Sequence, residues 1–93
     1  VVVMPDVDVA ETAPGVAGAI FFNSGQVCVA GSRLYAHKSV FDKVVEGMAE
    51  TAHFWAPRAS LDPEGHMGPL VSKEQHDRVV GYIEAGNIQV NNN

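Results

Sequence analysis

The stretch FFNSGQVCVAGSR, residues 21–33, contains the single cysteine of this 93-residue chain. Cys28 lies between Gly25 and Gly31, and its immediate neighbours are apolar. Glycine permits tight turns and lets a substrate approach the backbone closely. Backbone N–H groups in such a turn can face an oxygen that becomes negative during nucleophilic attack. A free cysteine is also among the residue types most often buried. The residues alone therefore leave two interpretations open, a core side chain or a nucleophile presented by the two turns.

The composition indicates one small globular domain. Hydrophobic residues make up 46% and charged residues 18% of the chain, which argues against disorder. The formal net charge of −5 gives no basic surface for nucleic acid, and no apolar run approaches the roughly 18–20 residues that span a bilayer. The histidines lack metal-ligand spacing. We therefore expect no nucleic-acid partner, no membrane association and no metal, and a single cysteine favours a reducing compartment, by default the cytoplasm.

The residues before the cysteine predict a strand followed by a helix. Residues 1–4 are a short β-branched run that is typical of a buried strand. Asp8 and Glu11 have the spacing of a capping box, which opens a helix that extends to about Phe22. Pro14 lies inside this helix, so the helix either kinks there or begins afresh with Pro14 in its first turn.

The residues after the cysteine predict two more strands and two more helices. In order, these are a strand at 33–37, a helix at about 40–52, a connecting loop at 57–69, a helix from Ser72 to about residue 85, and a last strand at 87–90, before a frayed end at 91–93. Gly86 is expected to end the last helix. This order of elements predicts an α/β fold with some parallel pairing. The small sheet and large apolar surface favour part of a larger sheet.

Residues 21–33 strongly resemble the catalytic-cysteine segment of the aldehyde dehydrogenase superfamily, whose pattern is approximately F-x-N-x-G-Q-x-C-x-A-x-S-R. Phe21 and Phe22 occupy the two positions before Asn23, and the positions that match from there on are Asn23, Gly25, Gln26, Cys28, Ala30, Ser32 and Arg33. The flanking residues 1–21, 33–48 and 67–86 are similar to the elements that surround this cysteine in the family. The resemblance implies part of the α/β catalytic domain, with an incomplete, parallel-type sheet.

The resemblance implies that Cys28 is the nucleophile. In the family the thiolate attacks an aldehyde to form a thiohemiacetal, hydride passes to NAD or NADP, and water hydrolyses the resulting thioester to a carboxylic acid. The Cys28 N–H would supply half of the oxyanion hole. Phe22, Val27 and Val29 match positions that shape the substrate pocket, and their character suggests an apolar or aromatic aldehyde.

The resemblance also implies roles for residues outside the substrate pocket. Gln75 and Arg78 match helix positions near the cofactor ribose in some members of the family. Asn23, Gly25 and Gln26 match the motif, and we expect them to support the loop, Asn23 and Gln26 through backbone hydrogen bonds.

Several parts of the family's machinery have no match in these residues. The glycine-rich cofactor half, the oxyanion asparagine and the general-base glutamate lie upstream in the family, and an E-x-F-G-P segment lies downstream. We therefore expect residues 1–93 to be a partial catalytic domain without the cofactor-binding domain, inactive alone, from an enzyme that is a homo-oligomer. Residues 87–93 depart from the family pattern and either match a later segment or are unrelated. The alternative function is a non-catalytic α/β interaction or assembly fragment with an inert or redox-sensing thiol.

Overall fold

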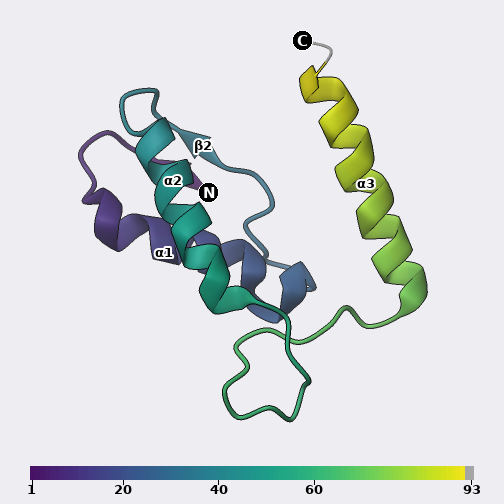
Figure 1. Cartoon of the computed structure of the whole chain (residues 1–93). Helices are drawn as coiled ribbons and strands as arrows, with labels where there is room; N and C mark the ends of the chain where they lie inside the picture. Colours follow the sequence, from purple (N-terminus) through teal and green to yellow (C-terminus); the bar gives the residue numbers. More distant parts are fainter. Residues whose placement is uncertain (92–93) are drawn as a thin grey trace.

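The computed structural model describes residues 1–91 and has a small α/β architecture (Figure 1). The elements are, in order, β1 (Val2–Val3), α1 (Val9–Phe21), the 3-10 helix η1 (Phe22–Gly25), β2 (Tyr35–Ala36), α2 (Phe41–Thr51), the 3-10 helix η2 (Ala52–Trp55) and α3 (Lys73–Asn91). The two strands pair in parallel, with Val2 opposite Tyr35 and Val3 opposite Ala36, and α1 lies in the connection between them. The predicted α/β class with parallel pairing is confirmed.

Helix α1 begins where the capping residues predict and continues without a break through its proline. The Asp8 carboxylate accepts a hydrogen bond from the Glu11 N–H at 3.2 Å. Pro14 is exposed inside the helix, so the predicted alternative of a helix that restarts there is wrong. The missing N–H of a proline removes one helical hydrogen bond, and burial of Ala13 and Val16 on either side holds the segment in place.

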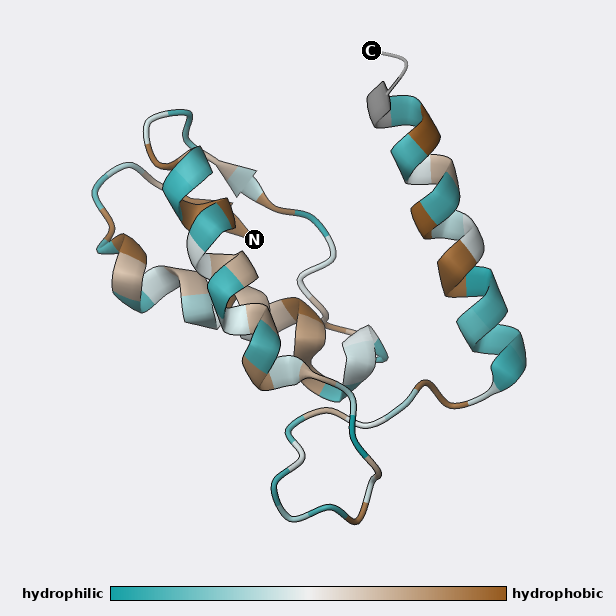
Figure 2. Cartoon of the chain, in the orientation of Figure 1, coloured by the Kyte–Doolittle hydropathy of each residue, from teal (hydrophilic) through white to brown (hydrophobic). Residues whose placement is uncertain are grey.

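The core is a small cluster of valines between the strands and the first two helices. Val3, Val16, Val40 and Val44 are buried together, and the figure coloured by hydropathy shows the apolar residues of this unit among hydrophilic ones (Figure 2). Helices α1 and α2 approach closely at Gly47, where an added Cβ would lie 2.7 Å from the Ala13 Cβ. The predicted helix at about 40–52 is confirmed as α2.

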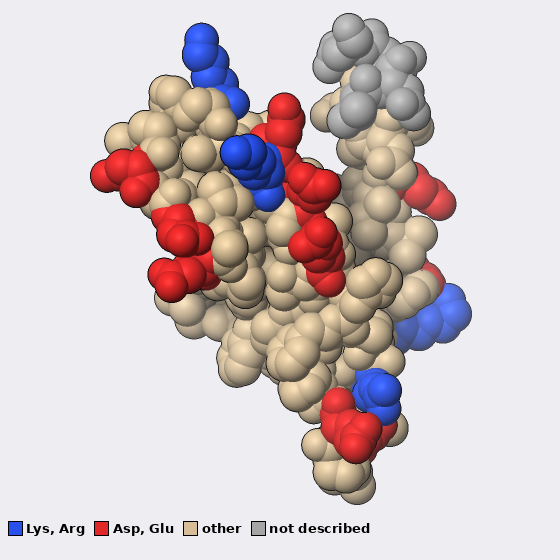
Figure 3. Space-filling view, turned by 60° about the vertical axis from the view of Figure 1, so that its left-hand side comes forward, with Lys and Arg blue, Asp and Glu red and all other residues tan. Residues whose placement is uncertain are grey.

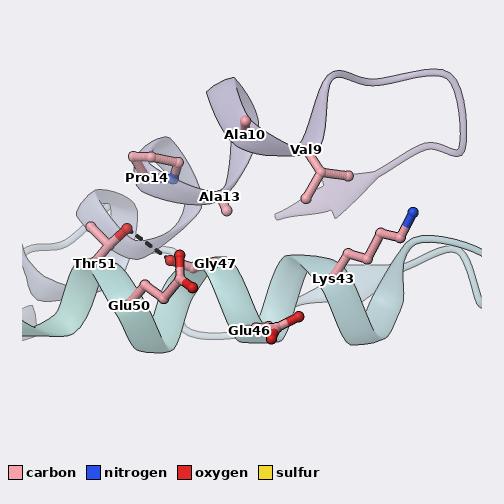
Figure 4. Close-up of a pocket in the computed structure, with 9 residues that line it drawn as sticks. All are labelled: Val9, Ala10, Ala13, Pro14, Lys43, Glu46, Gly47, Glu50 and Thr51. Atoms are coloured by element: carbon pink, nitrogen blue, oxygen red, sulfur yellow. Dashed lines mark hydrogen bonds between the residues drawn. The ribbon is translucent and has the colours of Figure 1, made fainter.

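A groove of about 380 Å³ lies between α1 and α2 (Figure 4). Lys43, Glu46 and Glu50 are among the residues that line it, and the Thr51 hydroxyl donates a hydrogen bond to the Gly47 carbonyl at 2.8 Å. The space-filling view shows several groups of acidic side chains on one face of the molecule (Figure 3). No residue of the cysteine loop lines this groove, so it is separate from the candidate site.

Helix α3 stands apart from the rest of the chain (Figure 1) and is longer than the sequence predicts. It continues through Gly86 to Asn91, so the predicted stop at Gly86 and the predicted strand at 87–90 are both wrong. A helix satisfies its backbone groups internally, whereas a strand needs a neighbouring strand to pair with, and the edge that residues 87–90 would need is not beside them. Of the frayed end at 91–93, Asn91 belongs to α3, and Asn92 and Asn93 lie outside the described residues. None of the helices in residues 1–91 is long and apolar enough to cross a membrane.

Candidate active site

A left-handed turn follows α1 and leads into the cysteine loop. The Phe22 N–H closes the helix by donating to the Gly18 carbonyl. Asn23, Ser24 and Gly25 then have φ angles of 51°, 59° and 74°. Glycine adopts this conformation freely and asparagine tolerates it, but it is unfavourable for most other residues, serine included. The chain therefore reverses direction just before Cys28 in a backbone conformation that needs support.

Asn23 and Gln26 brace this turn with three hydrogen bonds. The Gln26 backbone N–H donates to the Asn23 carbonyl at 3.1 Å, and the Gln26 Nε2 donates to the same carbonyl at 3.2 Å. In return, the Asn23 Nδ2 donates to the Gln26 carbonyl at 3.3 Å. These bonds fix the shape of the turn, because they connect only residues within it.

Two further hydrogen bonds tie the turn to the segment before α3. The Ser24 hydroxyl donates to the Gly68 carbonyl at 2.6 Å, and the Val71 N–H donates to the Gln26 Oε1 at 2.9 Å. Each bond joins residues more than 40 positions apart in the sequence. The sequence did not predict Gly68 or Val71 as neighbours of the cysteine loop. Both bind it through backbone groups, which are the same in nearly every residue type and therefore cannot be recognised in a sequence.

Cys28 lies at the corner of a second tight turn and is exposed. The Ala30 N–H donates to the Val27 carbonyl at 3.0 Å, which puts Cys28 and Val29 at the two central positions. The thiol is free and exposed, so in this chain Cys28 is not a core side chain. Among residues 1–91, the Cys28 N–H has no hydrogen-bond acceptor, so it remains able to donate to a ligand.

Two of the residues predicted to shape a substrate pocket, Val27 and Val29, flank Cys28 in this turn, and Phe22 lies at the start of η1. Val29 is 84% exposed and Phe22 is 61% exposed, whereas Val27 is half-buried. Val27 and Val29 thus place apolar side chains on either side of Cys28 in the chain, while the Phe22 and Val29 side chains are open to solvent.

Gly31 ends the loop and is required for space rather than for conformation. Its N–H donates to the Ala19 carbonyl at 2.8 Å. An added Cβ would lie 2.7 Å from the Val1 Cγ2 and 3.0 Å from the Ala19 Cβ, while only Gly25 among the glycines of residues 1–91 has a positive φ. The loop is therefore anchored against α1 at this end.

Gln75 and Arg78, the residues matched to the cofactor ribose, lie in the first turns of α3. The Arg78 guanidinium donates to the Gln75 Oε1 at 3.2 Å and to the Glu74 Oε1 at 3.3 Å. Nearby, hydrogen bonds from Lys73 and His76 lower the pKa of the exposed Asp77 carboxyl. The placement of Gln75 and Arg78 near the cofactor ribose stays a prediction.

Comparison with known proteins identifies the family. Residues 1–90 match the aldehyde dehydrogenase family, which extends the match beyond residue 86. Phenylacetaldehyde dehydrogenase of Pseudomonas fluorescens is 45% identical over 86 residues, which are 92% of this chain and 17% of that protein.

Solved structures show the same relationship. The γ-glutamyl-γ-aminobutyraldehyde dehydrogenase of Burkholderia cenocepacia matches 92% of this chain and 18% of its own, with a TM-score of 0.88 and 44% identity. An indole-3-acetaldehyde dehydrogenase of P. syringae, in complex with NAD+, matches 94% of this chain and 18% of its own, with a TM-score of 0.88 and 38% identity. The chain thus spans less than a fifth of the length of these relatives, and it belongs to the aldehyde dehydrogenase family.

Proposed function

We propose that this chain is the cysteine-bearing part of the catalytic domain of an enzyme that oxidises an aldehyde to a carboxylic acid with NAD or NADP. Family membership and the short span of the match support this assignment. The sheet supports it as well, because Val2 and Tyr35 leave one face exposed, whereas parallel sheets are normally covered on both faces. The cofactor-binding domain is a separate part of the complete enzyme, which we propose to be a homo-oligomer.

The exposed position of Cys28 on a braced loop is the observation that carries the proposal. In the proposed reaction the Cys28 thiolate adds to the aldehyde carbon, the carbonyl electron pair moves to the oxygen, and a thiohemiacetal forms. The Cys28 N–H, which has no acceptor among residues 1–91, donates to this oxygen as its negative charge develops. When bound, the nicotinamide cofactor supplies the hydride acceptor that takes the substrate to the thioester level. Water then cleaves the thioester to the carboxylic acid and restores the Cys28 thiol.

An apolar or aromatic aldehyde is the substrate class that we propose. Val27 and Val29 adjoin Cys28 in the chain and Phe22 is exposed at the start of η1, and burial of such apolar surface against a substrate contributes about 25 cal/mol per Å². Two of the similar proteins are named for aldehydes with aromatic groups, phenylacetaldehyde and indole-3-acetaldehyde. Phenylacetaldehyde is therefore a suitable first test substrate.

The test is the Cys28→Ala variant of the complete enzyme. We expect its kcat for phenylacetaldehyde to fall by at least about a thousandfold, because loss of a nucleophile that acts within a catalytic unit removes most of the rate enhancement. NADH binding, followed by fluorescence titration, is expected to stay unchanged. Ser39→Ala is the control, since Ser39 lies outside the cysteine loop and its hydrogen bonds within residues 1–91 go to His37, two residues away.

Turnover retained by Cys28→Ala would contradict the proposed mechanism. Thiol titration addresses the alternative of an inert thiol in a non-catalytic fragment. A Cys28 thiol in the complete enzyme that titrates near the ordinary value of about 8.5, together with no measurable NAD or NADP binding, would favour that alternative.

A further inference from the structure

We propose that Ser24 is a positioning residue for Cys28: its bond to Gly68 holds the left-handed turn, and through the turn the thiol, in register with the rest of the catalytic domain. This inference rests on the proposed function of Cys28. It concerns a residue at a position that the cysteine motif leaves open, since the motif specifies no residue type between Asn23 and Gly25.

The backbone at Ser24 shows why the turn needs an external support. With φ 59° and ψ 29°, Ser24 occupies the left-handed region, which costs an L-residue other than glycine roughly 1–2 kcal/mol. A serine kept there is expected to supply something that glycine would not. The side-chain hydroxyl is the group that distinguishes the two residues.

The hydroxyl makes a single, long-range contact. Its bond to the Gly68 carbonyl is 2.6 Å long and partly buried, which is short for an O–H···O bond. Within residues 1–91 no second bond of this hydroxyl competes with it. Gln26 makes the neighbouring tie, to Val71, but its amide also braces the turn internally. Ser24 is therefore the residue whose side chain acts only between the two segments.

The position of Cys28 depends on anchors on both sides of its loop. On the far side, the Gly31 N–H is bonded to the Ala19 carbonyl of α1. On the near side, the bonds between Asn23 and Gln26 preserve the shape of the turn but move with it. The location of the near side is therefore set by the end of α1 and by the two ties to residues 68–71. Loss of the Ser24 tie allows the turn and the thiol to shift together.

Two variants separate the hydroxyl from the backbone conformation. Ser24→Gly removes the tie and relieves the unfavourable φ, whereas Ser24→Ala removes the tie and keeps the unfavourable φ. In the complete enzyme we expect kcat to fall about tenfold in both variants, because a nucleophile displaced by about 1 Å can lose about a hundredfold in rate. KM is expected to change less than about twofold, since the apolar side chains that contact the substrate remain. Ser39→Ala is the matched serine control.

The melting temperature, measured beside kcat, distinguishes a positioning role of Ser24 from a purely structural one. We expect Ser24→Gly to melt at or above the wild-type temperature and Ser24→Ala below it, while kcat falls in both. A wild-type kcat in Ser24→Gly would overturn the proposal, because it would show that only the backbone conformation matters. A kcat that falls only in proportion to lost folded enzyme would overturn it as well. Failure of the proposed function is distinguishable, since it is reported by turnover in Cys28→Ala and not by the Ser24 variants.

Discussion

At the scale of single residues, Gly31 shows how a residue of the cysteine loop at a position that the motif leaves unspecified can be required for packing. An added Cβ would lie 2.7 Å from the Val1 Cγ2 and 3.0 Å from the Ala19 Cβ, so Gly31→Ala overpacks the site. We expect it to lower the free energy of unfolding by about 1–3 kcal/mol, measured by urea denaturation. Gly81→Ala is the control, because nothing lies within 4 Å of its added Cβ. Equal losses in the two variants would contradict this account.

The same residues show what the sequence could predict about the site. Glycine content indicated turns on both sides of Cys28, and Gly25 has the positive φ that such a turn uses. Gly31 is required because the fold brings Val1 and Ala19 against it. The hydrogen bond from Ser24 to Gly68 likewise joins residues that only the fold brings together. Local patterns report conformational preference, but they do not report which distant backbone carbonyl will accept a hydroxyl.

At the scale of the elements, a substitution at Gly86 distinguishes the predicted end of α3, at Gly86, from the observed end, at Asn91. If Gly86 ended the helix in a left-handed conformation, alanine there would be strained. It lies instead inside the helix with open space around it, so we expect Gly86→Ala to stabilise α3 by about 0.5–1 kcal/mol. Circular dichroism of the chain at 222 nm measures the change. Gly25→Ala is the opposing control, since its φ of 74° makes alanine unfavourable, and a loss of helix signal in Gly86→Ala would contradict the observed helix.

The elements that the sequence predicted best are those with a capping residue and a buried face. Asp8 begins α1 as its capping-box spacing indicates, and α2 buries Val44 against the core. The predicted helix end at Gly86 was wrong, although glycine is common at helix ends. Residues 87–90 have no neighbouring strand to pair with among residues 1–91, so they continue α3 instead. Because α3 stands apart from the strands, α1 and α2 (Figure 1), local helix formation decided the outcome there.

At the scale of the whole molecule, the chain consists of a packed unit and a separate helix. The strands, α1 and α2 share the valine core, whereas α3 stands apart (Figure 1) and exposes Tyr82, Ile83 and Ile88. The contacts between the two parts run through the segment before α3, where Ser24 and Gln26 bind Gly68 and Val71. Local stability should therefore differ between the unit and the helix.

Val44→Ala tests this division. Val44 is fully buried, and loss of its methyl groups is expected to cost the packed unit about 1–3 kcal/mol. Amide hydrogen exchange should then accelerate in α1 and α2, while the exchange of α3 amides stays at the wild-type rate, because α3 contributes nothing to the valine core. Val45→Ala is the control in the same helix: Val45 is 42% exposed, and exposed substitutions usually change stability by less than about 0.5 kcal/mol. Faster exchange in α3 that matched the change in α1 would show that the chain unfolds as a single cooperative unit.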